Sequence, residues 1–138
     1  MTPLYTATVA AMGDGRNGRI QSTDGHLDAQ VRVPSELGGP GGATNPEQLF
    51  AAGYAACFHS ALKRVAAQEK ADTSDSEVVA DVSLHALAEG GYGLAAALEI
   101  TLPALDRQTA EDLVAKAHRI CPYSNATRGN VEVSLTVA

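Results

Sequence analysis

Apolar and polar positions alternate along the first third of the chain in the pattern of β-strands. Residues 4–10 are rich in threonine and small side chains, and residues 27–33 switch between apolar and polar at every step. Successive side chains of a strand point to opposite faces of a sheet, so this alternation is typical of a half-buried strand. Asp24 and Gly25 form a hairpin-turn signal just before the second stretch. We predict three strands in this region.

The same alternation returns in the second half of the chain. Residues 78–86 and 94–102 flank a glycine-rich turn at residues 89–93, and together they predict a β-hairpin. Residues 131–137 alternate in the same way and predict a last strand.

Residues 46–70 predict a long helix. Asn45 is a favourable N-cap, Pro46 fits the first helical position, and Glu47 suits the positive end of a helix. Residues 49–62 are apolar or small on nearly every side, which is typical of a buried helix rather than an amphipathic one.

A second helix is predicted over residues 106–120, with Asp106 or Thr109 as its N-cap. Pro122 sets its end, because the residue before a proline avoids the helical region. The inner stripe of this helix is expected to consist of Leu113, Ala117 and Ile120.

The order of these elements predicts an α+β fold in which antiparallel sheet dominates. A length of 138 residues suits one domain, so we expect a single domain over residues 1–138. A helix of about 25 residues is about 37 Å long, and so small a monomer can hardly cover an apolar helix of that length on all sides. We therefore expect a homodimer whose partner covers the exposed stripe.

Composition and charge narrow the classes of partner. The chain is 45% hydrophobic, and 16 acidic against 10 basic residues give a net charge of −6 without any basic block, so we expect no nucleic-acid partner. No basic residue precedes Arg16, so we expect no secretory signal. The longest apolar run, residues 49–58, is shorter than the roughly 17–25 residues that span a bilayer. We expect a cytoplasmic protein without a membrane partner.

Two cysteines, Cys57 and Cys121, are the main candidates for chemistry. A structural disulfide is disfavoured in a reducing cytosol. No Cys-x-x-Cys pair and no zinc-like histidine spacing is present, so we expect no metal site. The residues alone leave two interpretations open, namely buried thiols that act as small hydrophobic side chains or a reactive pair.

A reactive Cys57 needs a cation from elsewhere in the protein. It lies about three turns inside the long helix, where the helix-end field has faded and burial raises the thiol pKa. Arg16 and Arg19, in a glycine-rich turn, are two candidates, although either can be a solvated turn residue. Glu47 can interact with the helix N-terminus, or it can anchor a guanidinium through two hydrogen bonds.

Cys121 ends the second helix beside Pro122 and the polar run at residues 123–125. Such a thiol can move, which suits a resolving cysteine that approaches a sulfenic acid. The alternative is a helix-end cysteine with no role.

Several segments together resemble one family. TNPEQLFAAGYAACF (residues 44–58) and CPYSNATRGN (residues 121–130) are similar to the organic hydroperoxide resistance (Ohr) group of the OsmC-like superfamily, and the second segment points to this group rather than to its OsmC sister group. RNGR (16–19), ELGGPGG (36–42) and GGYGL (90–94) agree in order. The resemblance runs nearly from end to end.

The resemblance implies a thiol peroxidase with an OsmC-like fold, built as an intertwined homodimer with central helices flanked by sheets. It places the reactive cysteine at Cys57 and the resolving cysteine at Cys121. It places the active-site arginine at Arg16 rather than Arg19, and its carboxylate partner at Glu47.

The resemblance also implies a reaction without a bound cofactor, metal, haem or flavin. The Cys57 thiolate reduces an alkyl or fatty acyl hydroperoxide to an alcohol and becomes a sulfenic acid, and Cys121 then forms a disulfide with it. A dihydrolipoyl group on a partner protein reduces that disulfide. We expect three apolar side chains to line the peroxide pocket: Leu49, Phe50 and Phe58.

Two other classes of function stay open on the sequence. One is a disulfide-switched redox sensor or binding module that does not turn over. The other is a structural dimer with inert thiols. A short glycine-rich loop and His59 depart from the family pattern, and we expect them to affect substrate preference rather than the chemistry.

Overall fold

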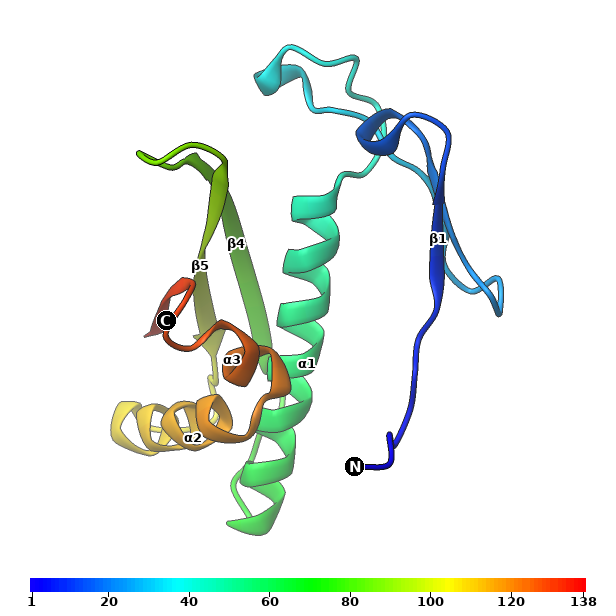
Figure 1. The fold of residues 1–138 in the computed structure, drawn as a ribbon. Helices are drawn as coiled ribbons and strands as arrows, with labels where there is room; N and C mark the ends of the chain where they lie inside the picture. The colour runs from blue at the N-terminus through cyan, green and yellow to red at the C-terminus, as the bar shows by residue number, and fades with distance from the viewer. The chain divides into compact units, whose positions relative to one another are not determined.

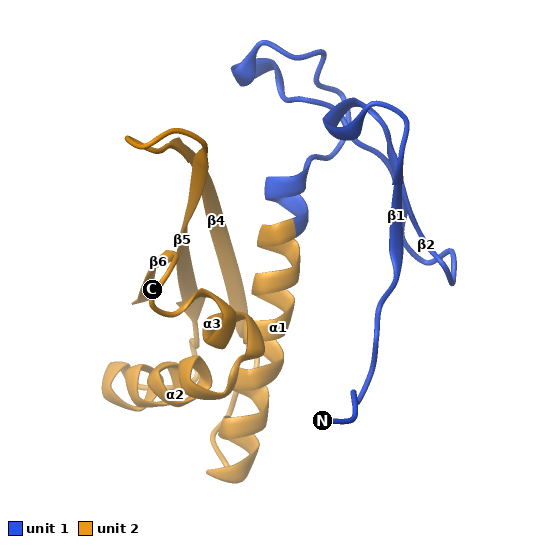
Figure 2. Cartoon of the chain, viewed as in Figure 1, with its two compact units in different colours: residues 1–49 blue, residues 50–138 orange.

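The computed structural model describes residues 1–138, which form two compact units, residues 1–49 and residues 50–138 (Figures 1 and 2). Each unit contains one three-stranded sheet. That the two units together make a single domain over residues 1–138 stays a prediction.

The N-terminal unit carries an antiparallel sheet in the order β1 (Val9–Met12), β2 (Arg19–Ser22), β3 (Asp28–Gln30). The predicted turn at Asp24 and Gly25 lies between β2 and β3. The predicted strand at residues 4–10 was wrong for its first half, because pairing with β2 begins only at Val9.

The third predicted strand, over residues 27–33, is also shorter than expected. Only Asp28–Gln30 pair with β2 in the sheet, and Val31 instead forms a parallel bridge with Thr44. Leu27, which the alternation placed inward, is 37% exposed. Alternation marks residues able to form a strand, whereas the available hydrogen-bonding neighbour sets where the strand ends.

Little of the N-terminal unit is buried. Val31 is the one buried apolar side chain in residues 1–49. Seven large apolar side chains are exposed there: Met1, Leu4, Tyr5, Val9, Met12, Leu27 and Leu37. A three-stranded sheet needs a packed apolar face for stability, so the sheet lacks a core of its own.

The long helix α1 (Pro46–Gln68) begins where the sequence predicts. The Asn45 side chain accepts a hydrogen bond from the backbone N–H of Gln48 at 2.9 Å, which confirms it as the N-cap. The helix ends two residues earlier than predicted, and Lys70 follows with a left-handed φ of 56°.

The second sheet combines antiparallel and parallel pairing. β4 (Glu77–Ala86) and β5 (Tyr92–Thr101) form the predicted hairpin, and β6 (Glu132–Val137) pairs with β5 in parallel. The parallel pair needs a crossover, which α2 (Arg107–Ile120) and α3 (Pro122–Thr127) supply.

The helix α2 matches its predicted range, and Asp106 is its N-cap, accepting a hydrogen bond from the backbone N–H of Thr109 at 2.8 Å. The prediction for Ile120 was wrong: this residue is 46% exposed. The inner face of α2 consists of Ala110, Leu113, Val114 and Ala117. The sequence analysis did not predict α3. The available signal was Pro122, because proline is favoured at the first position of a helix.

The core of the C-terminal unit brings together α1, β5 and α2 (Figure 1). Its largest fully buried apolar side chains are Tyr54, Phe58, Leu62, Leu98, Ile100 and Leu113. Helices and a largely antiparallel sheet confirm the α+β class. No helix of the structure combines the length and the apolar character needed to cross a membrane.

Candidate active site

The two cysteines lie side by side in the C-terminal unit. The Sγ atoms of Cys57, on α1, and of Cys121, at the corner between α2 and α3, are 3.8 Å apart, and both thiols are free. A disulfide needs sulfurs about 2.05 Å apart, so a shift of about 1.8 Å would close the pair. Cys121 needs only this short shift to reach Cys57, because the corner already holds the two thiols adjacent.

The surroundings of Cys57 within this unit favour the neutral thiol. Burial raises the pKa of Cys57 above its ordinary value of 9.0, and the neighbouring Cys121 raises it further. The backbone N–H of Tyr123, which hydrogen-bonds the sulfur, lowers this pKa, and the groups that shift it include no cation. A thiolate at neutral pH therefore needs a positive charge that these neighbours do not supply.

Three aromatic rings form a cluster on the cysteine side of α1. Ring centroids lie 6.4 Å apart for Phe50 and Tyr54, 6.4 Å for Phe50 and Tyr123, and 5.9 Å for Tyr54 and Tyr123. Gly53 permits this approach, because a Cβ there would lie 2.8 Å from the Tyr123 hydroxyl. The expectation that Phe58 lines a peroxide pocket was wrong, since its side chain is fully buried in the core.

A buried polar network lies beside the cysteines, and the sequence analysis missed it. The Tyr54 hydroxyl is 2.8 Å from Ser124 Oγ and 3.3 Å from Thr127 Oγ1, and His118 Nδ1 is 2.8 Å from the same Ser124 Oγ. Burial, and then the Arg128 guanidinium, lower the pKa of His118. A tyrosine inside an apolar helix was the available signal, because a buried phenol needs a partner.

Arg16 and Glu47 form a two-pronged ion pair within the N-terminal unit. Arg16 Nη1 and Nη2 donate to the two carboxylate oxygens of Glu47 at 2.9 and 2.8 Å. Arg16 lies in the short 3₁₀ helix at Gly15–Asn17, and Glu47 lies in the first turn of α1. The hydrogen bond from Arg16 lowers the pKa of Glu47. Arg19 instead pairs with Asp28 at 2.7 Å, so of the two arginines only Arg16 binds Glu47.

Comparison with known proteins shows the family of this chain. Residues 39–136 match the family model described as OsmC-like protein. An organic hydroperoxide resistance protein of Xanthomonas axonopodis pv. citri is 54% identical over 137 residues, which cover 98% of this chain and 95% of the relative. The chain belongs to the organic hydroperoxide resistance group of the OsmC-like family.

Solved structures of the organic hydroperoxide resistance group share the fold. The protein from Legionella pneumophila superposes with a TM-score of 0.95 at 53% identity, covering 99% of each chain. A Vibrio cholerae protein with captopril bound in one of its active sites gives a TM-score of 0.93 at 42% identity, covering 99% of this chain and 94% of the other. The resemblance seen in the sequence and the OsmC-like fold are confirmed.

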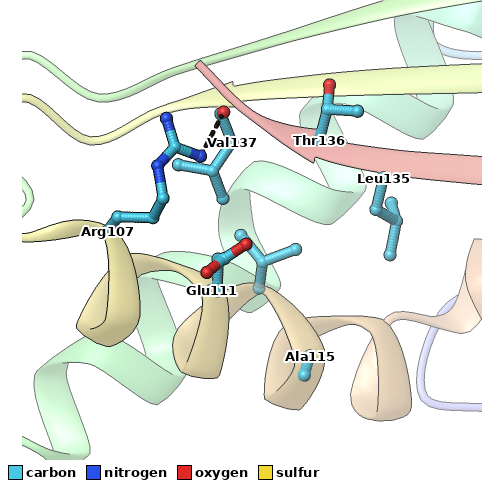
Figure 3. A pocket seen from close by; sticks show the side chains of 7 residues that line it. Arg107, Glu111, Ala115, Leu135, Thr136 and Val137 are labelled. Atoms are coloured by element: carbon cyan, nitrogen blue, oxygen red, sulfur yellow. Dashed lines mark hydrogen bonds between the residues drawn. The ribbon is translucent and has the colours of Figure 1, made fainter.

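This member of the group has a separate hollow of about 450 Å³ between α2 and β6 (Figure 3). Arg107 Nη1 donates to the Val137 carbonyl at its rim at 3.1 Å. Neither cysteine lines the hollow, so its size does not make it the reactive site. The structure contains no cluster of three or more His, Cys, Asp or Glu side chains suited to a metal ion.

Proposed function

We propose that this chain is a cysteine-based peroxidase that reduces organic hydroperoxides to alcohols. The observation that carries the proposal is the free thiol pair, with Cys57 Sγ and Cys121 Sγ 3.8 Å apart at the edge of an aromatic cluster. The substrate class is supported by the group to which the chain belongs, whose members are named for organic hydroperoxides.

The proposed reaction uses two thiols and one peroxide. The Cys57 thiolate attacks one peroxide oxygen, the O–O bond breaks, and the alkoxide leaves and takes a proton to become the alcohol. Cys57 is then a sulfenic acid. The Cys121 sulfur attacks the Cys57 sulfur, and the sulfenic oxygen leaves as water, so two thiols have supplied the two electrons.

Arg16 is the proposed source of the positive charge. Two of its five N–H donors bind Glu47, so three remain to hydrogen-bond a thiolate or a peroxide oxygen. The Glu47 side chain, only 16% exposed, fixes the guanidinium without taking up its remaining donors. Glu47 is therefore a positioning residue in this proposal, and Arg16 acts on the reacting atoms.

A dihydrolipoyl group on a partner protein is the proposed reductant, because a dithiol can reduce the disulfide by exchange and leave as its own disulfide. Captopril carries a thiol, and its presence in an active site of the Vibrio cholerae relative supports access of a thiol-bearing molecule. We place the reaction in the cytoplasm, where thiols are kept reduced.

A homodimer is the proposed assembly. Ala52 and Ala56 are exposed on one face of α1, and the N-terminal sheet lacks a core of its own. A second copy of the chain would cover both surfaces. Sedimentation equilibrium of the reduced protein is expected to give twice the chain mass, and a monomer at all concentrations would contradict this assembly.

Turnover assays test the function. The reduced protein is mixed with cumene hydroperoxide or hydrogen peroxide, with dihydrolipoamide or a monothiol as reductant. We expect many turnovers with the organic hydroperoxide and dihydrolipoamide, and none for Cys57→Ser. Retention of both thiols in excess peroxide would defeat the proposal. A single turnover that dihydrolipoamide cannot renew would instead favour a redox sensor.

A further inference from the structure

The buried polar network brackets both cysteines. Tyr54 lies three residues before Cys57 on α1, and His118 lies three residues before Cys121 on α2. Ser124, on α3, lies three residues after Cys121 and is the point at which the two arms meet. We name Tyr54, Ser124 and His118 the relay.

Each proton of the relay has one assignment when His118 is neutral and accepts at Nδ1. Thr127 Oγ1 donates its proton to the Ser124 carbonyl at 3.1 Å, so it has no proton left to donate to the Tyr54 hydroxyl. The closer partner of Tyr54 is Ser124 Oγ, which accepts a hydrogen bond from the phenol O–H and donates one through its own O–H to His118 Nδ1. No buried side-chain nitrogen or oxygen lacks a partner. Deleting the Ser124 hydroxyl removes the partner of His118 Nδ1, and deleting the Tyr54 hydroxyl removes one of the two partners of Ser124 Oγ.

The helix α3 depends on such contacts for its position. It has six residues, too few for a stable helix in isolation, so tertiary contacts hold it. Ser124 and Thr127 are its buried residues, and both reach Tyr54. At its end, Arg128 donates to the His118 carbonyl at 2.6 Å. The same short helix begins beside Cys121, whose sulfur lies 3.8 Å from that of Cys57.

We propose that Tyr54, Ser124 and His118 are positioning residues that hold the Cys121 corner against α1 and so set how readily Cys57 and Cys121 close into a disulfide. A role of these three residues in catalysis rests on the proposed peroxidase function. The relay itself acts on the thiol–disulfide equilibrium, which needs no peroxide.

The test measures that equilibrium in the full-length protein. Wild type, Tyr54→Phe, Ser124→Ala and the double variant are equilibrated in mixtures of reduced and oxidised glutathione. One oxidised glutathione yields two reduced molecules as each disulfide forms, and alkylation with mass spectrometry gives the disulfide fraction. A change that destabilises the reduced and oxidised protein equally cancels in this ratio, so a merely structural role would not move it.

We expect each single variant to lower the disulfide equilibrium constant about tenfold, which raises the reduction potential by about 30 mV. The double variant is expected to lose much less than the product of the single losses, because both changes break the same bond. Tyr92→Phe and Ser134→Ala are matched controls, since both residues are exposed in the same unit and neither is in the relay. We expect these two to match wild type.

A second pair of variants tests the inference if the variants at the buried positions Tyr54 and Ser124 fold poorly. His118 is only partly buried, and an asparagine amide can accept the Ser124 proton near the place of Nδ1. We expect His118→Leu to lower the constant about tenfold and His118→Asn to stay within about threefold of wild type. Equal losses for both, or relay variants all within about twofold of wild type, would overturn the inference.

The two proposals can fail separately. If the protein does not turn over cumene hydroperoxide but the relay variants shift the glutathione equilibrium, the peroxidase proposal fails and the relay stands. If turnover occurs and the equilibrium does not move, only the relay fails.

Discussion

Arg16 binds Glu47 through two hydrogen bonds, of 2.9 and 2.8 Å, across 31 positions of the sequence. The pair joins a glycine-rich turn to the first turn of α1. Such planar, two-pronged pairing fixes the direction of the guanidinium as well as its position. In the proposed mechanism that orientation matters more than the stability that the pair contributes.

Removing the guanidinium is expected to slow the reaction of Cys57 with an organic hydroperoxide. Arg16→Ala removes the donors proposed to stabilise the thiolate and the developing oxyanion, so we expect a loss of about 10²-fold in the first step. The pKa of Cys57, followed by thiolate absorbance, should rise because burial is then unopposed by the cation. Arg19→Ala is the control, since Arg19 pairs with Asp28. Equal rates for the two variants would exclude Arg16 as the proposed cation.

The ion pair also predicts a dependence of stability on pH. Arg16 lowers the pKa of Glu47 below its ordinary value of 4.5. A depressed carboxyl pKa contributes stability above pH 4.5, and that contribution is lost as the pH falls through the folded-state value. Because the Arg16 side chain is 44% exposed, we expect the ion pair to contribute no more than about 1 kcal/mol to the free energy of unfolding. Between pH 7 and pH 3, the free energy of unfolding measured with urea should fall less in Glu47→Gln than in wild type. An identical fall in the two proteins would contradict a stabilising interaction between Arg16 and Glu47.

Gly53→Ala is expected to destabilise the protein although alanine favours helices. The added Cβ would lie 2.8 Å from the Tyr123 hydroxyl and 3.1–3.2 Å from two ring carbons. We expect the clash to outweigh the roughly 1 kcal/mol gain in helix propensity and to lower the free energy of unfolding by about 1 kcal/mol. Urea denaturation measures this change.

The matched control for Gly53→Ala adds Tyr123→Phe, which removes the hydroxyl nearest to the new Cβ. Part of the lost stability should return in this double variant compared with Gly53→Ala. A loss that Tyr123→Phe does not reduce would place the strain elsewhere.

Lys70→Gly is expected to stabilise the protein. Lys70 follows the end of α1 with φ of 56°, where the Ala71 N–H bonds to the Ala66 carbonyl at 2.9 Å. A side chain in this left-handed region costs roughly 1–2 kcal/mol, and glycine avoids the cost. Loss of a positive charge near the helix C-terminus offsets part of the gain, so we expect a net increase of about 0.5–1 kcal/mol. Lys70→Ala removes the same charge but keeps a Cβ, so it should show no gain in thermal unfolding.

Local patterns were sufficient for most of the secondary structure. The hairpin of β4 and β5 and the start of α1 follow from alternation and from Asn45 and Pro46. The same periodic pattern did not predict burial correctly along the whole of α2. Ile120 continues the apolar stripe of this helix, but its side chain is exposed at the helix end. Periodicity marks a face of a helix, whereas the neighbouring element sets how far along that face contact extends.

The sequence by itself determined the α+β class, the two cysteines as the main candidates for chemistry and the family, since these depend on near-neighbour patterns and long motifs. The family resemblance already placed Glu47 as the partner of Arg16 rather than Arg19, and the structure shows that ion pair. Only the tertiary structure decided that the sulfurs of Cys57 and Cys121 lie 3.8 Å apart and that a buried relay joins α1, α2 and α3. These contacts join residues up to 70 positions apart. Periodicity records which face of an element is apolar, but partners so distant are chosen by how whole elements fill a common core.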